Sequence, residues 1–284
     1  MTTEVSAAVG ARAEPAPGAP PAPRPVTPLG ILAHELDEVR RGLAGVDGID
    51  PGVRERLERA CVLAGGLDPY VTRCTTGESD ALAGLAARTA SEDWSSHDGP
   101  GLEQEMLSGH VEGQALKMLV HLGRARRVLE VGMFTGYSAL AMAEALPEGG
   151  VVVACEVDPG VAAIARECFD ASPHGAKIDV RVAPAADTLA ALAAAGERCD
   201  LVFVDADKGG YAGYLQAVLD GDLLAEHGVV AVDNTLMQGG PWADAEPAGN
   251  AAAIAAFNQA VVDEPRVEQV LLPLRDGLTL LRRV

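Results

Sequence analysis

The sequence predicts an α/β fold built on a mostly parallel sheet that ends in an antiparallel hairpin. From about residue 127 onward, short apolar runs rich in β-branched residues alternate with segments of helical periodicity. The last two apolar runs are separated by Arg275-Asp276-Gly277, and Asp-Gly between apolar runs is typical of a hairpin turn. Five parallel strands closed by such a hairpin give a seven-stranded sheet, which differs from the six parallel strands of the dinucleotide-binding fold.

The alternating pattern also fixes the expected order of the elements. Parallel strands are expected at Arg127–Val131, Val151–Glu156, Ile178–Val182, Leu201–Val204 and Val229–Val232. Helices are expected at Tyr137–Leu146, Val161–Phe169, Ala186–Ala195, Tyr211–Leu219 and Ala251–Val262. The hairpin strands are expected at Val267–Leu274 and from Leu278 onward. Right-handed crossovers then place helices on both faces of the sheet.

The first 100 residues are organised differently. Residues 1–26 are rich in Ala and Pro, which predicts a disordered tail. Residues 27–100 are expected to form a helical appendage, with helices starting at Pro28, near Val53–Ala64 and near Glu78–Thr89. A further long helix is expected over Leu102–Leu122, so that the domain that carries the sheet spans residues 101–284.

The composition excludes several classes of partner. A formal net charge of −19 argues against nucleic acid, which needs a basic surface, and against docking on anionic lipid. Five cysteines without a C-x-x-C pair are typical of reduced thiols. No apolar run approaches the roughly 18 residues of a membrane-spanning helix. We therefore expect a soluble, cytoplasmic protein with neither a nucleic-acid nor a membrane partner.

Two polar clusters follow two neighbouring strands of the predicted sheet. Asp205 ends the fourth strand and is followed closely by Lys208, and Asp233 with Asn234 ends the fifth. Carboxyl ends of parallel strands meet at one edge of a sheet, where such folds bind ligands. Two carboxylates and an amide are hard oxygen ligands that select Mg²⁺ or Ca²⁺ over zinc, and an amine beside such an ion can act as a base. The alternative is that the acids only cap the following helices.

The turns after the first two strands suggest a second binding region. The first turn contains Glu130-Val-Gly132-Met-Phe-Thr-Gly136, whereas a pyrophosphate site would need G-x-G-x-x-G. We expect this turn to bind an uncharged or cationic ligand beside Glu130, with a packed turn that binds nothing as the alternative. Glu156 ends the second strand, where an acidic residue can accept hydrogen bonds from both ribose hydroxyls. A solvated loop charge is the alternative there.

Other polar and aromatic residues admit two interpretations. His110 and Glu112 lie two residues apart on the expected helix and therefore diverge, which favours a polar helix face over a metal pair. Four larger side chains either line a binding site for a planar substrate or belong to the core. They are Tyr211, Tyr214, Met237 and Trp242.

Together these motifs resemble one enzyme family. Glu130-x-Gly-x-x-x-Gly-Tyr-Ser138, Glu156, Asp205-Ala-Asp-Lys-x-x-Tyr and Asp233-Asn-Thr-Leu are similar to the motifs of the metal-dependent, S-adenosylmethionine-using O-methyltransferases of the caffeoyl-CoA and catechol type. The resemblance covers residues 102–284 and implies the Rossmann-like sheet of class I methyltransferases. It also implies a divalent cation, with Mg²⁺ expected and Ca²⁺ or Mn²⁺ as alternatives, and a homodimer.

The resemblance also implies roles for individual residues. The S-adenosylmethionine site would be lined by Ser108, Glu130, Gly132, Met133, Ser138, Glu156, Ala185, Asp205 and Asp207. The metal ion would be held by Asp205, Asp233 and Asn234, and the catalytic residues would be Lys208, as general base, and Asp205. The substrate would contact Gln238, Tyr214 and Trp242. Gln238 stands where the plant enzymes have an acceptor-binding asparagine, which disfavours a caffeoyl-CoA acceptor.

Further segments are similar to the O-methyltransferases of mycosporine biosynthesis, which make 4-deoxygadusol from its demethyl precursor. They are Thr27-Pro-Leu-Gly, Leu67-Asp-Pro-Tyr-Val-Thr-Arg-Cys-Thr-Thr, Glu105-Met-Leu-Ser-Gly-His-Val-Glu-Gly-Gln and Leu272-Pro-Leu-Arg-Asp-Gly-Leu-Thr. This similarity implies a vicinal enediol acceptor, with a catechol or a hydroxycinnamoyl-CoA as the alternative. Two adjacent oxygens can chelate one cation, after which Lys208 removes the proton and the oxygen attacks the sulfonium methyl. A nicotinamide-dependent oxidoreductase and a non-catalytic ligand-binding relative are the rival classes.

Overall fold

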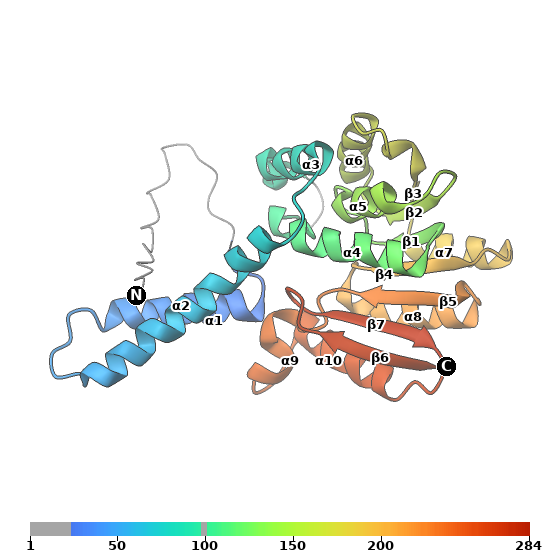
Figure 1. The fold of residues 1–284 in the computed structure, drawn as a ribbon. Helices are drawn as coiled ribbons and strands as arrows, with labels where there is room; N and C mark the ends of the chain where they lie inside the picture. Colours follow the sequence, from blue (N-terminus) through green and yellow to red (C-terminus); the bar gives the residue numbers. More distant parts are fainter. Residues whose placement is uncertain (1–23, 98–100) are drawn as a thin grey trace, which may run out of the picture.

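A seven-stranded sheet forms the centre of the computed structural model, which describes residues 24–97 and 101–284 (Figure 1). The strands lie in the order β3-β2-β1-β4-β5-β7-β6. Their bounds are β1 Arg127–Val131, β2 Val151–Glu156, β3 Ile178–Val182, β4 Cys199–Val204, β5 Leu224–Val232, β6 Val267–Leu272 and β7 Leu278–Arg283. The first five pair in parallel, and β7 runs antiparallel to β5 and β6. The predicted sheet and its terminal hairpin are confirmed.

Two strands begin earlier than the sequence predicted. β4 starts at Cys199 and β5 at Leu224, and their pairing shifts register between Cys199 and Leu201. The early part of β5 contains Glu226 and His227, whose side chains are exposed. Because these polar residues interrupt the apolar run, the run alone marks only the buried end of the strand.

Helices cover both faces of the sheet, as predicted. They are α4 His110–Gly123, α5 Tyr137–Ala145, α6 Pro159–Asp170, α7 Ala185–Ala194, α8 Tyr211–Asp220 and α10 Gly249–Val262. Successive strand residues point to opposite faces, so Val128 packs in the cluster that includes α4, α5 and α6, and Leu129 in the cluster that includes α7, α8 and α10. Both faces of the sheet are therefore apolar, which explains why its strands read as continuous hydrophobic runs.

The N-terminal helices differ in how far they join this body. α1 (Pro28–Gly42) and α2 (Pro51–Cys74) pack against each other and project from the sheet domain, and α3 (Asp80–Ser91) lies against it (Figure 1). None of the residues of α1 is buried, whereas Leu82 and Leu85 of α3 belong to the core. The expected disordered tail falls mainly on residues 1–23, outside the described residues.

Two predicted helix boundaries are wrong. α2 does not stop near Ala64 but continues through two glycines and Pro69 to Cys74, although residues 65–70 are exposed and each glycine costs about 1 kcal/mol of helix propensity. The helix expected over Leu102–Leu122 begins only at His110. Gly109 has a φ of 78°, which ends any preceding helix, and residues 104–106 form a single 3₁₀ turn. The segment before α4 is therefore a loop at the edge of the sheet.

No helix among the described residues is both long and apolar enough to cross a membrane.

One glycine after β1 holds the start of α5 against α6. Gly136 has a φ of 87°, in the left-handed region, and a Cβ placed there would lie 2.2 Å from Cζ of Phe169. Both the backbone conformation and the packing therefore require glycine.

We predict that Gly136→Ala destabilises the protein more than Gly196→Ala. Gly196 also has a positive φ, of 68°, but nothing lies within 4 Å of its added Cβ, so it isolates the conformational cost of about 1 to 2 kcal/mol. The clash with Phe169 should add about 1 to 3 kcal/mol for Gly136→Ala. Denaturant unfolding of both variants measures the difference in free energy of unfolding. Equal losses would contradict the packing argument.

Candidate active site

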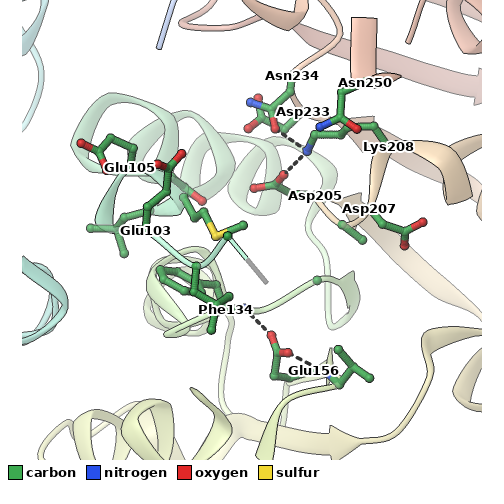
Figure 2. A pocket seen from close by; sticks show the side chains of 18 of the residues that line it. Glu103, Glu105, Phe134, Glu156, Asp205, Asp207, Lys208, Asp233, Asn234 and Asn250 are labelled. Carbon is green, nitrogen blue, oxygen red and sulfur yellow. Dashed lines mark hydrogen bonds and ion pairs between the residues drawn. The ribbon is translucent and has the colours of Figure 1, made fainter. Parts of the chain in front are cut away.

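A cavity of about 910 Å³ opens at the carboxyl edge of the parallel strands. Its walls come from the turns after β1, β2, β4 and β5, from the loop before α4 and from the hairpin turn between β6 and β7. Figure 2 shows Asp205, Asp233, Asn234 and Lys208 gathered on one side, with Glu156 farther away beyond Phe134. The two clusters predicted from the sequence therefore share one cavity.

The Lys208 ammonium lies at the centre of the polar cluster. Its Nζ donates hydrogen bonds to Asp205 Oδ1 at 2.9 Å and to Asn234 Oδ1 at 2.6 Å (Figure 2). It also donates to the Tyr211 hydroxyl at 2.8 Å. Asp233 is buried beside them, and burial followed by the charge of Asp205 raises the pKa of the Asp233 carboxyl above its usual range. Oxygens from the ends of β4 and β5 thus converge on one positive charge.

This donor set fits a hard divalent cation. Two carboxylates and an amide supply oxygen ligands, and all three residues border the cavity, which leaves room for further ligands. Within residues 24–97 and 101–284, no group of three His, Cys, Asp or Glu side chains surrounds a possible metal position. The set therefore depends on the amide oxygen of Asn234 as its third donor.

The backbone fixes the positions of these donors. The Asp205 amide donates to Val131 O at 2.9 Å, and the Asp233 amide donates to Val204 O at 3.0 Å, so the parallel ladders extend through both aspartates. Gly132 has a φ of 91°, and a Cβ there would lie 2.0 Å from the Asp205 carbonyl oxygen. The absence of a side chain at Gly132 therefore lets the end of β4 approach the turn after β1.

The acid at the end of β2 is held by backbone amides. One Glu156 oxygen accepts from Phe134 N at 2.8 Å, and the other accepts from Val157 N at 2.7 Å and Asp158 N at 2.8 Å. Burial raises the pKa of the Glu156 carboxyl, and these backbone donors act against the rise. The carboxyl borders the cavity in a fixed orientation, which suits recognition of a polyol such as ribose.

Glu130 lies beneath the main cavity rather than on its wall. Its side chain is fully buried, and neither carboxylate oxygen has a hydrogen-bond partner among the described residues. Burial raises the pKa of Glu130 to about 8. Met133 and Ser138 border a small adjoining hollow, which Ser108 shares with the main cavity.

The remaining expected cofactor residues border the main cavity. They are Ser108, Gly132, Ala185, Asp205 and Asp207. The Tyr214 hydroxyl donates to Asp207 Oδ1 at 2.5 Å, and burial raises the pKa of Tyr214 to about 12. Tyr214 therefore contacts Asp207, a residue expected at the cofactor site, rather than the cluster around Lys208.

Two aromatic residues lie apart from the cavity wall. Trp242, on the short helix α9 (Gly240–Ala243), is 60% exposed and does not border the cavity. Tyr211 is buried in the core, edge-on to Phe257, with only its hydroxyl directed to Lys208. Gln238 and Met237 do border the cavity, next to Asn234.

The sequence prediction of a polar helix face at Glu112 is wrong. The side chain is 2% exposed and borders the cavity, because α4 begins at His110 and its first turn lies at the edge of the sheet. Burial, followed by the charge of Asp233, raises the pKa of Glu112 well above its usual range. His110 instead contacts the carbonyl oxygen of Thr76 at 2.5 Å, so the two side chains do diverge.

Several described residues at the cavity were not identified from the sequence, and three of them enter from distant segments. Asn250 enters from the start of α10 (Figure 2), and Arg275 and Asp276 enter from the hairpin turn. Asp276 is 4% exposed, accepts a hydrogen bond from Gln238 N at 2.6 Å, and has its pKa raised to about 6 by burial. The predicted hairpin could have located Arg275 and Asp276. Because β7 runs antiparallel to β5, the turn that precedes β7 lies at the carboxyl edge of the parallel strands.

Comparison with known proteins identifies relatives of the whole sheet domain. The O-methyltransferase family matches residues 78–284. A caffeoyl-CoA O-methyltransferase of Petroselinum crispum is 33% identical over 219 residues, which cover 73% of this chain and 85% of that protein. The catechol O-methyltransferase domain-containing protein 1 of Mus musculus is 40% identical over 171 residues, which cover 60% of this chain and 64% of that protein.

Solved structures show the same fold. The SAH-bound methyltransferase of Podospora anserina superposes with a TM-score of 0.66 at 29% identity, covering 84% of this chain and 100% of that one. The O-methyltransferase TomG of Streptomyces achromogenes, solved with SAM, gives 0.65 at 27% identity, covering 77% of this chain and 96% of that one. The sheet is thus the class I methyltransferase sheet, and the chain belongs to the S-adenosylmethionine-dependent O-methyltransferase family of the caffeoyl-CoA and catechol type.

Proposed function

We propose that this O-methyltransferase methylates one oxygen of a vicinal diol or enediol that chelates a divalent cation. The observation that carries the proposal is the convergence of Asp205 and Asn234 on one cationic group beside a large cavity. Asp205, Asp233 and Asn234 would hold the ion, with Mg²⁺ expected and Ca²⁺ or Mn²⁺ as alternatives. When bound, the ion supplies Lewis acidity that makes a chelated hydroxyl easier to deprotonate.

Lys208 is the proposed general base. Its Nζ is within hydrogen-bond distance of two of the proposed metal ligands, so it lies where the acceptor hydroxyl would lose its proton. The Tyr211 hydroxyl, 2.8 Å away, holds the amine in this position. The acceptor oxygen then forms a bond to the methyl carbon while the carbon–sulfur bond breaks, and the proton stays on Lys208. S-Adenosylhomocysteine and the methyl ether are the products.

The other side of the cavity is the proposed cofactor site. Glu156 would accept hydrogen bonds from the ribose hydroxyls, and Glu130 would pair with the cationic amino group of the cofactor. Support comes from the rigid backbone hold on Glu156, from the two unpartnered oxygens of Glu130, and from relatives solved with SAH or SAM. The remaining residues proposed for this site are Ser108, Gly132, Met133, Ser138, Ala185, Asp205 and Asp207.

The charge of the cavity favours a compact acceptor without phosphates. Among residues 24–97 and 101–284, three basic residues border it, Arg24, Lys208 and Arg275. Within the same ranges nine acidic residues border it, namely Glu103, Glu105, Glu112, Glu156, Asp158, Asp205, Asp207, Asp233 and Asp276. A coenzyme A thioester carries several phosphate charges and would be repelled even with the ion and the cationic cofactor bound. We propose demethyl-4-deoxygadusol as the acceptor, with a catechol as the alternative.

Two broader expectations also stay predictions. A homodimer and a cytoplasmic location are implied by the family resemblance. Sedimentation velocity of the purified protein measures the first, and fractionation of the source cells measures the second.

The first prediction is that activity depends on the metal and on two adjacent hydroxyls. Exhaustive chelation should lower methyl transfer to catechol by at least about 100-fold, because metal stabilisation contributes several kcal/mol, and Mg²⁺ should restore it. Asp205→Ala should stay inactive with added Mg²⁺. Asp200→Ala, at the opposite end of β4, is the matched control that keeps the metal response. Catechol monomethyl ether should be a poor acceptor. Full activity under chelation would reject the metal role.

The second prediction concerns Lys208. Lys208→Met should lower kcat by about 10²- to 10⁴-fold, the usual effect of losing a general base, while S-adenosylmethionine affinity changes little. Lys117→Met is the control, since Lys117 pairs with Glu144 and does not border the cavity. Steady-state kinetics and calorimetric titration separate the two effects. An unchanged kcat would exclude Lys208 as the base.

The third prediction follows from the pKa of Glu130, which burial raises to about 8. A cationic ligand group prefers the ionised carboxylate, so cofactor binding lowers this pKa. Affinity for S-adenosylhomocysteine should therefore rise with pH, by at most about tenfold per unit, and level off above about pH 8. Glu130→Gln should bind weakly and lose this dependence. Calorimetry between about pH 5.5 and about pH 9 measures this pH dependence of the affinity. An identical pH profile in the variant would exclude Glu130 as the titrating group.

A further inference from the structure

Two side chains at the proposed metal side of the cavity, Glu112 and Arg275, carry polar atoms without a hydrogen-bond partner among the described residues. Glu112 Oε1 has no partner in the part of the chain that the structure describes, although the side chain is only 2% exposed. Its other oxygen lies 3.8 Å from Nε of Arg275, which is too far for a hydrogen bond. The Arg275 guanidinium likewise makes no hydrogen bond to any described residue, and its side chain is 29% exposed. Both residues border the cavity.

The backbone around the pair holds it in place. Glu112 lies in the first turn of α4, and Arg275 lies in the hairpin turn between β6 and β7. Gly109 directly precedes α4, and a Cβ there would lie 2.6 Å from Nη1 of Arg275. The guanidinium therefore rests against the start of α4 in space that only a glycine leaves open. This packing places the side chains of Glu112 and Arg275 near each other, although they come from segments far apart in the sequence.

Glu112 is poorly explained as a further metal ligand. Among the described residues, no three acidic, histidine or cysteine side chains surround one metal position, so Glu112 does not complete such a group with Asp205 and Asp233. A buried oxygen without a partner is rare in folded proteins and costs stability, and such groups are concentrated at functional sites. A hydroxyl group of a ligand in the cavity would donate a hydrogen bond to it.

We propose that Glu112 and Arg275 form a second acceptor subsite, which binds oxygen substituents of the acceptor other than the two at the metal. Glu112 Oε1 accepts a hydrogen bond from an acceptor hydroxyl, and Arg275 donates to a neighbouring hydroxyl or carbonyl oxygen. This inference rests on the proposed function and narrows its substrate class to compact, polyhydroxylated rings. An acceptor with only hydrocarbon at this subsite leaves both groups unpaired and is selected against.

The test compares two acceptors that differ by one hydroxyl. The kcat/KM of the purified enzyme is measured with pyrogallol and with catechol, in S-adenosylmethionine and Mg²⁺. The ratio of pyrogallol to catechol should fall by about tenfold in Glu112→Leu, since a hydrogen bond to a charged group is lost. Arg275→Met should lower the ratio in the same direction. Glu144→Gln is the matched control, because this buried carboxyl is bound by Lys117 and Ser79 away from the cavity and should keep the wild-type ratio.

A second measurement does not depend on turnover. Mn²⁺ affinity, followed by electron paramagnetic resonance without acceptor, should stay within about threefold of wild type in both variants, because neither residue is assigned to the ion. Calorimetric titration of pyrogallol into the complex with S-adenosylhomocysteine and Mg²⁺ should show weaker binding. If Glu112→Leu does not fold, Arg275→Met, at a partly exposed position, carries the test.

Three outcomes would contradict the proposed subsite. An active wild type with an unchanged ratio in the variants would exclude the subsite while leaving the proposed function intact. Loss of Mn²⁺ affinity in Glu112→Leu would make Glu112 a metal ligand instead. Failure of the wild type to methylate either diol would reject the proposed function and, with it, this inference.

Discussion

Carboxylates crowded at the carboxyl edge of the sheet need a compensating cation, and the rest of the site is arranged around that need. Asp205 and Asp233 meet because the parallel strands β4 and β5 end side by side. Among the described residues, the Lys208 ammonium lies 2.9 Å from Asp205 Oδ1, and Arg275 borders the same cavity. The carboxylates of Glu112, Asp205 and Asp233 outnumber these two cations, whereas a divalent ion would balance the charge and leave the amine available for proton transfer. Charge balance and reactivity are thus linked.

Close backbone approach is what makes this crowding possible. Gly132 lets the end of β4 lie against the turn after β1, so Asp205 lies between the proposed cofactor site and the proposed metal site. The terminal hairpin closes the other flank, since β7 pairs with β5 and returns Asp276 to the same edge. The methyl donor, the metal and the acceptor can then share one cavity.

The sequence was sufficient wherever function depends on position within a strand. Apolar runs located the buried strands, and the polar residues directly after them, such as Asp205 and Asn234, necessarily reach the ligand edge. It was insufficient where tertiary packing decides. The expected long helix does not extend before His110, because Gly109 has a positive φ. Glu112 therefore lies in the first turn of α4 and is buried, although the sequence predicted a surface position. Arg275, which lies beside Glu112, belongs to a hairpin far away in the sequence, and no local sequence pattern predicts that the two side chains lie close together.

The most direct test is a crystal structure with Mn²⁺, located by anomalous scattering. We expect one peak within coordination distance of Asp205, Asp233 and Asn234, with the Lys208 amine moved out of hydrogen-bond contact with Asn234 Oδ1. A structure at saturating Mn²⁺ in which no peak appears at this edge, and in which Lys208 still bridges Asp205 and Asn234, would contradict it.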